Sequence, residues 1–123
     1  MLNNIDILKM ASAMARHAAD RHQVLSQNIA NADTNGYKAK DLEPFSEAYA
    51  RMSARGDATG ANAAPAWRTQ TVNAPGVASP NGNTVSLEDQ MMRSVEAQQQ
   101  HEAATVIYKK TLGMLRMSLS RNA

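Results

Sequence analysis

The chain has 123 residues, which is one domain's worth of sequence at most, and it carries a formal net charge of +2. Its residues are 43% hydrophobic but only 4% aromatic, so the apolar part consists mostly of aliphatic, helix-compatible types. The absence of Cys excludes disulfides, thiolate metal sites and a Cys nucleophile. The small net charge indicates no acidic partner, and no run of about 18 apolar residues is present to span a bilayer.

The sequence contains no pattern typical of an enzyme. HExxH, GxGxxG and GxxxxGK are absent, and the pair Gly76 and Gly82 has neither the spacing nor the following Lys of a phosphate loop. His17 and His22 lie five residues apart and share no helical face, and no further ligand completes a metal set. We therefore expect no catalytic residue, no cofactor and no metal.

Residues 5–31 are predicted to form a long amphipathic helix. Asn3 or Asn4 can cap its start, and Asp6 suits the first turn. Small and apolar residues recur at spacings of three and four, which is typical of a coiled-coil stripe. The members of this stripe are Ile5, Leu8, Ala11, Ala15, Ala18, His22, Leu25 and Ile29. Because the stripe is rich in Ala, it allows close approach of a partner helix.

The helix is predicted to end within residues 28–45, which read NIANADTNGYKAKDLEPF. Short polar side chains in this segment compete for backbone hydrogen bonds and favour helix ends and turns. Asn35-Gly36 is a strong turn dipeptide, since Gly tolerates positive φ without steric cost. We predict a positive φ at Gly36.

A short helix is predicted after Pro44. Its apolar face would consist of Phe45, Ala48, Tyr49 and Met52, and it would bring Phe45 and Tyr49 near the turn.

Residues 56–84 are rich in Gly, Pro, Ala and Asn and are predicted to form a loop. Within the loop, residues 67–72 alternate in a way that allows a short strand. The single Trp, Trp67, is expected to anchor the loop either onto a helix or onto a neighbouring subunit.

Residues 85–120 are predicted to form a second long helix, which Ser86 and Asp89 begin as a capping box. The three-and-four spacing on this helix is followed by Leu87, Met91, Ser94, Gln98, His101, Thr105, Tyr108, Leu112, Leu115 and Leu119. A second apolar line runs beside it through Met92, Val95, Ala103, Val106 and Ile107, which indicates more than one neighbour. The polar run 98–101 either sets register between helices or faces solvent.

The end of this second helix is basic. Lys109, Lys110, Arg116 and Arg121 follow Glu102 with no later acid, and they complement the negative end of the helix dipole. We interpret them as a solvated helix end rather than as a site for anionic lipid or nucleic acid, because no aromatic stacking pattern accompanies them.

Two such helices do not complete a stable core. At 1.5 Å per residue, helices of about 26 and 33 residues span roughly 39 and 50 Å. A hairpin of the two leaves residues such as Met10, Met14 and Val95 uncovered, and its Ala-rich stripe buries little area. We expect a marginal monomer that becomes ordered when its helices pack with those of neighbouring copies, as in an assembly subunit.

The segment after the first helix resembles the N-terminal motif of the bacterial flagellar rod and hook proteins. The matching residues are Asn28, Ala30, Asn31, Thr34, Gly36, Tyr37 and Lys38, and Phe45 stands where that motif usually carries an aromatic. The C-terminal segment 87–116 resembles the proximal rod member of the family, although His101 stands where an aromatic is common and Gly113 interrupts the apolar run. The resemblance covers both ends of the chain but not residues 56–84.

The resemblance and the periodicity together lead us to expect a mainly α fold. Two long terminal helices would pack as a coiled-coil-like pair, with a short helix and a loop-rich, partly β middle. Residues 1–45 would hold the first helix and the turn motif, residues 46–84 a variable middle, and residues 85–123 the second helix. The two ends would form one helical core domain. The helix-packing residues we expect are Leu8, Ala15, Leu25, Ile29, Met91, Val95, Val106, Leu112 and Leu115.

The resemblance implies a structural subunit of the flagellar basal-body rod that transmits torque in the periplasmic space and is required for flagellar assembly and motility. It implies assembly with copies of itself, with rod proteins including FlgC and with the adaptor FliE. It further implies passage through the flagellar type III export apparatus, and the start MLNNID lacks the basic and apolar regions of a cleaved signal. The alternatives are another rod subunit such as FlgC, or a helical adaptor or chaperone that binds a partner helix.

Overall fold

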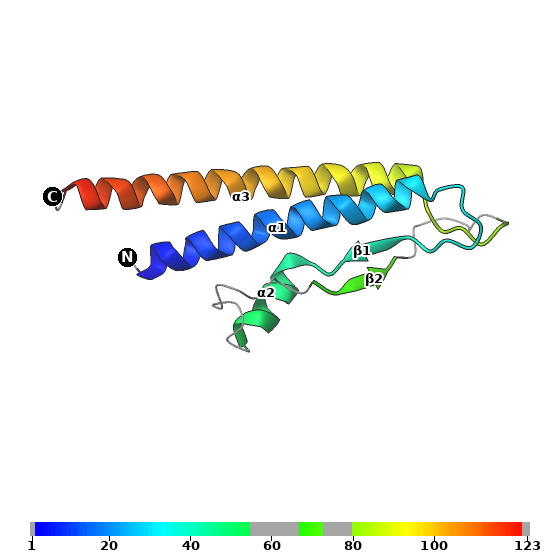
Figure 1. Cartoon of the computed structure of the whole chain (residues 1–123), viewed down its shortest axis with the longest axis horizontal. Helices are drawn as coiled ribbons and strands as arrows, with labels where there is room; N and C mark the ends of the chain where they lie inside the picture. The colour runs from blue at the N-terminus through cyan, green and yellow to red at the C-terminus, as the bar shows by residue number, and fades with distance from the viewer. Residues whose placement is uncertain (1, 55–66, 73–79, 122–123) are drawn as a thin grey trace.

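Two long helices lie side by side along the molecule in the computed structural model, which describes residues 2–54, 67–72 and 80–121 (Figure 1). Helix α1 comprises Leu2–Ala30 and helix α3 comprises Leu87–Arg121, which are 29 and 35 residues long. The two helices are antiparallel, so that both termini lie at the same end of the molecule (Figure 1). The prediction of a mainly helical fold with two long terminal helices in contact is confirmed.

The middle of the chain forms a small unit against α1, on the side away from α3 (Figure 1). It consists of strand β1 (Lys40–Leu42), helix α2 (Phe45–Ala54) and strand β2 (Thr69–Thr71). The strands pair antiparallel, with Lys40 opposite Thr71 and Leu42 opposite Thr69. The predicted helix after Pro44 and the predicted strand within 67–72 are confirmed. Strand β1 was not predicted, because three residues are too few to show an alternating pattern.

Small residues at heptad spacing form the contact between α1 and α3. Ala11 and Ala18 on α1, and Ala97 and Ala104 on α3, are at most 1% exposed. Leu25 continues the line on α1, whereas Gln90 and Thr111 continue the line on α3. The distance between two packed helices depends on the side chains at their contact, so this alanine seam keeps the pair close.

The stripe predicted on α3 does not form the contact with α1. The residues that do form it lie one position earlier in the sequence. The stripe members Met91 and Tyr108 are 66% and 41% exposed, whereas Gln90, one position earlier, is buried. The physical reason is that the face of α3 toward α1 is small or polar. The large apolar side chains of α3 instead follow its outer faces, and a hydrophobic pattern detects those.

The other residues expected at helix contacts are distributed as follows. Leu25 is buried within the chain; Leu8, Ala15, Leu112 and Leu115 are half-buried; Ile29, Val95 and Val106 are exposed. Among the residues that the structure describes, nothing covers the exposed members, and their role in packing against other copies stays a prediction.

Overpacking the alanine seam tests this arrangement. Ala104→Leu inserts three carbon atoms where the helices touch, and we expect it to lower the free energy of unfolding by about 1–3 kcal/mol. Ala103→Leu, on the exposed face one residue away, should change the free energy by less than about 0.5 kcal/mol. Thermal unfolding followed by circular dichroism measures both, and equal losses in the two variants would contradict the seam.

Candidate functional site

Asn28 joins the last turn of α1 to β1 and to α3. Its Nδ2 donates to the backbone oxygen of Lys40 at 2.6 Å and to Oε1 of Gln90 at 2.9 Å. Its Oδ1 accepts from the backbone N–H of Lys40 at 3.1 Å and from the hydroxyl of Tyr37 at 3.2 Å. The side chain is fully buried, and it uses both donors and both acceptor positions of a primary amide. With Lys40 it exchanges two hydrogen bonds, as an opposing strand residue would.

The turn after α1 is held by the segment just before α3. Gly36 has a φ of 73°, which confirms the predicted left-handed conformation. Its N–H donates to the backbone oxygen of Asn81 at 2.9 Å, and the N–H of Thr84 donates to the backbone oxygen of Tyr37 at 3.0 Å. The N–H of Ala39 donates to the hydroxyl of Thr84 at 2.9 Å. The chain therefore returns to the turn before α3 begins.

Asn83 binds backbone carbonyl groups of the turn that follows α1. Its Nδ2 lies 2.9 Å from the backbone oxygens of Asn31 and Ala32 and 2.7 Å from that of Thr34. Its Oδ1 accepts from the N–H of Val85 at 2.8 Å, and the residue is only 2% exposed. These carbonyls lie just beyond the end of α1 at Ala30, so this amide, supplied from a distant segment, holds the turn that follows the helix.

The motif residues divide into a group at the turn and one outlier. Tyr37 bonds to Asn28, the ammonium of Lys38 donates to the backbone oxygen of Gly82 at 2.9 Å, and Thr34 bonds to Asn31. Phe45 does not lie near the turn: its ring centroid is 5.7 Å from that of His17, midway along α1. That expectation was wrong, because β1 runs back along α1 and carries α2 away from the turn (Figure 1).

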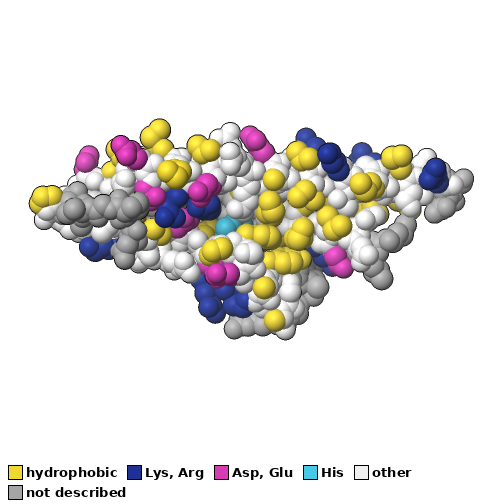
Figure 2. All heavy atoms as spheres, turned by 180° about the vertical axis from the view of Figure 1, so that it is seen from behind, with side chains coloured by type: hydrophobic (Ala, Val, Ile, Leu, Met, Phe, Trp, Pro, Cys, Tyr) yellow, Lys and Arg dark blue, Asp and Glu magenta, His cyan; other side chains and the backbone are white. Residues whose placement is uncertain are grey.

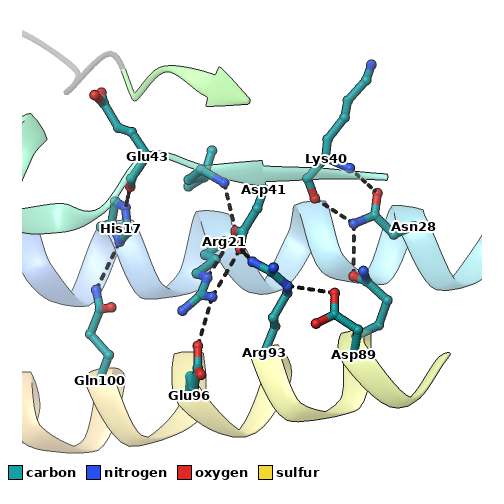
Figure 3. A network of polar contacts seen from close by, with 12 residues as sticks. His17, Arg21, Asn28, Lys40, Asp41, Glu43, Asp89, Arg93, Glu96 and Gln100 are labelled. Atoms are coloured by element: carbon teal, nitrogen blue, oxygen red, sulfur yellow. Dashed lines mark hydrogen bonds and ion pairs between the residues drawn. The ribbon is translucent and has the colours of Figure 1, made fainter. Parts of the chain in front are cut away.

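Asp41 is a buried carboxylate that holds two arginines (Figure 3). Arg21 of α1 binds it through Nε and an amino nitrogen, both at 3.0 Å, and Arg93 of α3 binds it at 2.7 Å. The N–H of Leu42 adds a fourth hydrogen bond at 2.7 Å. The three charged groups come from α1, β1 and α3, so this contact joins all three elements.

Two further acids complete this charge network. Arg93 donates to Asp89 at 2.8 Å one turn earlier on α3, and Arg21 donates to Glu96 at 3.1 Å. Burial raises the pKa of Asp41, but the hydrogen bonds and positive charges of Arg21 and Arg93 outweigh burial and hold that pKa below its ordinary value of 3.8. Asp41 therefore stays ionised in the folded chain at neutral pH.

His17 is a structural histidine, held between α3 and the segment after β1 (Figure 3). Its Nε2 lies 2.7 Å from the backbone oxygen of Glu43, and its Nδ1 lies 2.9 Å from Nε2 of Gln100. A carbonyl only accepts and an amide nitrogen only donates, so the bonds assign the proton to Nε2. Gln100 also donates to the backbone oxygen of Met14 at 3.1 Å. Gln100 thus sets register between the helices, whereas His101 is exposed.

Trp67 anchors the middle unit on α1 of its own chain. Its indole N–H donates to Asp20 at 2.8 Å, and its ring meets His17 edge to face with centroids 4.9 Å apart. Phe45 and Tyr49 extend the group, with centroids 5.4 Å apart. Of the two anchoring options left open by the sequence, the first is present in this chain.

Glu43 closes the opposite side of the middle unit. Its carboxylate accepts from Arg51 of α2 at 2.6 and 2.7 Å and from the N–H of Arg68 at 2.9 Å. The hydrogen bonds from Arg51 lower the pKa of Glu43 below its ordinary 4.5, although burial opposes them. Arg21, Asp41, Glu43, Asn83 and Arg93 were not singled out from the sequence, because each acts through partners far along the chain.

The outer faces of the long helices carry large apolar side chains. Those on α3 that are at least 41% exposed are Leu87, Met91, Met92, Val95, Val106, Tyr108, Met114, Met117 and Leu119. Figure 2 shows hydrophobic side chains recurring along the length of the molecule. Within the described residues, no group of three or more His, Asp or Glu side chains is placed to hold a metal. The exposed apolar side chains of α3 offer a surface for packing against other helices.

Comparisons with known proteins match the chain to one family. The family described as flagella basal body rod protein matches residues 10–38, which include α1 beyond its first turns and the turn motif. FlgB of Escherichia coli is 28% identical over 138 aligned residues, covering 99% of this chain and all of that protein. Over nearly its whole length, the chain is therefore similar to a flagellar basal-body rod protein. It is similar also to FlgB of Agrobacterium fabrum, at 28% identity over 127 residues and 95% of each chain, and to FlgB of Yersinia enterocolitica, at 38% identity over 61 residues, 49% of this chain and 44% of that protein.

Asn28 is expected to carry much of the turn's stability. Asn28→Ala deletes four hydrogen bonds and leaves the buried Gln90 without its partner, so the free energy of unfolding should fall by about 2–4 kcal/mol. Gln27→Ala, an exposed neighbour on the same helix, should change it by less than about 0.5 kcal/mol. Urea unfolding curves provide the comparison, and an Asn28→Ala variant as stable as Gln27→Ala would refute the role.

The lowered pKa values of Asp41 and Glu43 predict acid sensitivity. A carboxyl whose pKa is lower in the folded than in the unfolded chain stabilises the fold fully above its unfolded pKa. That stability is lost as pH falls through the folded pKa. Stability should therefore be level near neutral pH and decline below about pH 4. Asp41→Asn should be less stable at neutral pH but less sensitive to acid. An unchanged acid profile in this variant would show that Asp41 does not contribute.

Proposed function

We infer that the chain is a FlgB-like structural subunit of the flagellar basal-body rod, in its proximal part. The observation that carries this conclusion is the end-to-end alignment with FlgB proteins, which covers both long helices and the middle unit. It favours a FlgB-like subunit over a FlgC-like one, because the relatives reported above are all FlgB.

The physical profile of the chain supports a mechanical role. The polar contacts at the turn and the middle unit are nearly complete within one chain, whereas α3 exposes apolar side chains along its whole length. Such a surface is stabilised when other helices cover it, at roughly 25 cal/mol per Å² of apolar area buried. Long helices bundled in this way resist bending and twisting. We propose that this is how the subunit transmits torque and supports motility.

The partners follow from the same proposal. The exposed faces of α1 and α3 would pack against further copies of this chain, against other rod proteins including FlgC, and against the basal-body adaptor FliE. In the part of the chain that the structure describes, no helix is long and apolar enough to cross a membrane. We propose that the subunit reaches the periplasmic rod through the flagellar type III export apparatus, without a cleaved signal peptide.

Isolation of basal bodies tests this function directly. The gene is deleted in the source organism, and the strain is complemented with a tagged copy of the chain. We expect a non-motile deletion strain, restored swimming after complementation, and the tagged chain in purified basal bodies by mass spectrometry. A protein that is absent from basal bodies and leaves swimming unaffected would refute the rod assignment.

Acidic substitutions on the outer face of α3 should prevent assembly while leaving the folding of the isolated chain intact. Met91 and Val106 are 66% and 49% exposed, so Met91→Asp/Val106→Asp should change the free energy of unfolding of the isolated chain by less than about 1 kcal/mol. Swimming should nevertheless be lost, because buried carboxylates between subunits are costly. Ser53→Asp, on the exposed face of α2, serves as the charge control and should swim. Normal motility of the double variant would contradict assembly through this face.

A further inference from the structure

Charge is divided along α3. The half nearer the turn contains four acids and one base, namely Glu88, Asp89, Glu96, Glu102 and Arg93. The half nearer the C-terminus contains only bases, namely Lys109, Lys110, Arg116 and Arg121. Figure 2 shows the same division, with Lys and Arg side chains toward the end where the termini lie. Because α1 is antiparallel, its Lys9 and Arg16 lie toward that basic end, against a single acid, Asp6.

Neither the helix dipole nor ion pairs among the described residues explain why the C-terminal half of α3 carries only basic residues. The helix dipole acts within about the last turn, whereas Lys109 and Lys110 lie three turns before the end of α3 at Arg121. Among the described residues, none of the four bases of this half forms an ion pair. Their charges are exposed, and no acid in the described part of the chain pairs with them.

Four of the charges lie on one line of the helix surface. Glu88, Glu102, Lys109 and Arg116 are separated by multiples of seven residues, with Val95 at the remaining position. Glu88, Glu102 and Lys109 each precede a buried residue of the α1 contact by two positions: Gln90, Ala104 and Thr111, respectively. Two residues turn a helix by about 200°, so this charged line faces away from α1.

We propose that this charged line is a register surface for a second copy of this chain. The copy is parallel and shifted by three heptads along α3. The shift of 21 residues, about 32 Å, brings Lys109 of one copy level with Glu88 of the next. It also places Arg116 level with Val95, between the two acids. The parallel direction rests on the proposed function, because a rod subunit adds to a polar shaft.

Like charges exclude the smaller shifts. With no shift, every charge of the line meets its own type. A shift of one heptad places Arg116 beside Lys109, and a shift of two heptads places Glu102 beside Glu88. Three heptads is the smallest shift that brings opposite charges together without a like pair. Charged residues flanking a helix contact set register and partner choice in this way.

Charge exchange tests the register. Lys109→Glu/Arg116→Glu makes the line acidic, and Glu88→Lys/Glu102→Lys makes it basic. Each variant alone should self-associate about tenfold more weakly than the unmodified chain at low salt, and an equimolar mixture of the two should recover the association. Lys110→Glu/Arg121→Glu is the matched control, since it changes the same charge on the same half of α3 but off the line.

The measurement is sedimentation of the purified full chains, with helicity checked by circular dichroism. Association should weaken in 1 M salt, where charges are screened within about 3 Å. Equal losses in the control and the line variants, or no recovery on mixing, would overturn the proposal. Unchanged association in all variants would overturn it as well, while leaving the rod assignment to the basal-body experiment.

Cysteine cross-linking separates a parallel from an antiparallel pair, and the chain has no Cys of its own. In an antiparallel pair that matches Glu102 with Lys109, Val106 of one copy lies beside Val106 of the other. In the parallel pair the two Val106 residues lie far apart. Val106→Cys should therefore form little disulfide-linked dimer, while a mixture of Val95→Cys and Arg116→Cys chains should link. Efficient self-linking at position 106 would overturn the parallel register.

Discussion

The buried amide of Asn28 supports three parts of the chain that are distant in sequence. It lies in the last turn of α1, exchanges two hydrogen bonds with the backbone of Lys40 as a strand partner would, and donates a hydrogen bond to Gln90 of α3. Asn83 performs the complementary task from the other side, because it binds the turn after α1 from the segment that precedes α3. Both amides are buried and hydrogen-bonded, and a buried polar group of this kind is costly unless its partners are all in place. The turn therefore specifies one relative position of the two helices, which the nearly featureless alanine seam alone would not do.

Much of the fold could be predicted from the sequence, because its signals are local. Helix caps, the Asn35-Gly36 turn, Pro44 before α2 and the alternating residues of β2 each act within a few residues. The resemblance located the turn motif for the same reason, since its members are close in sequence. The site could be predicted only in part. Asp41 lies 20 residues from Arg21 and 52 from Arg93, and no pattern in one sequence links residues so far apart.

The error in the predicted α3 stripe is explained by the face on which this helix carries its large apolar residues. A helix that buries one face usually places its largest apolar residues there, and the prediction assumed so. Here the inner face is Gln90, Ala97, Ala104 and Thr111, whereas Met91, Val95 and Val106 face outward. In the proposed assembly, hydrophobic periodicity would report the contacts between subunits as much as the contact within the chain.

This division between a polar turn and apolar outer faces suits a subunit that must keep its shape before its neighbours arrive. Apolar packing between copies is nondirectional and tolerates sliding along a helix, so it supplies adhesion but little register. Ion pairs on an exposed face contribute little adhesion, but like charges brought together oppose the wrong alignment. With Glu88 and Glu102 on one half of α3 and Lys109 and Arg116 on the other, the two effects are complementary. In the proposed assembly, the apolar residues would hold neighbouring helices together, and the charges would decide where along the rod those helices meet.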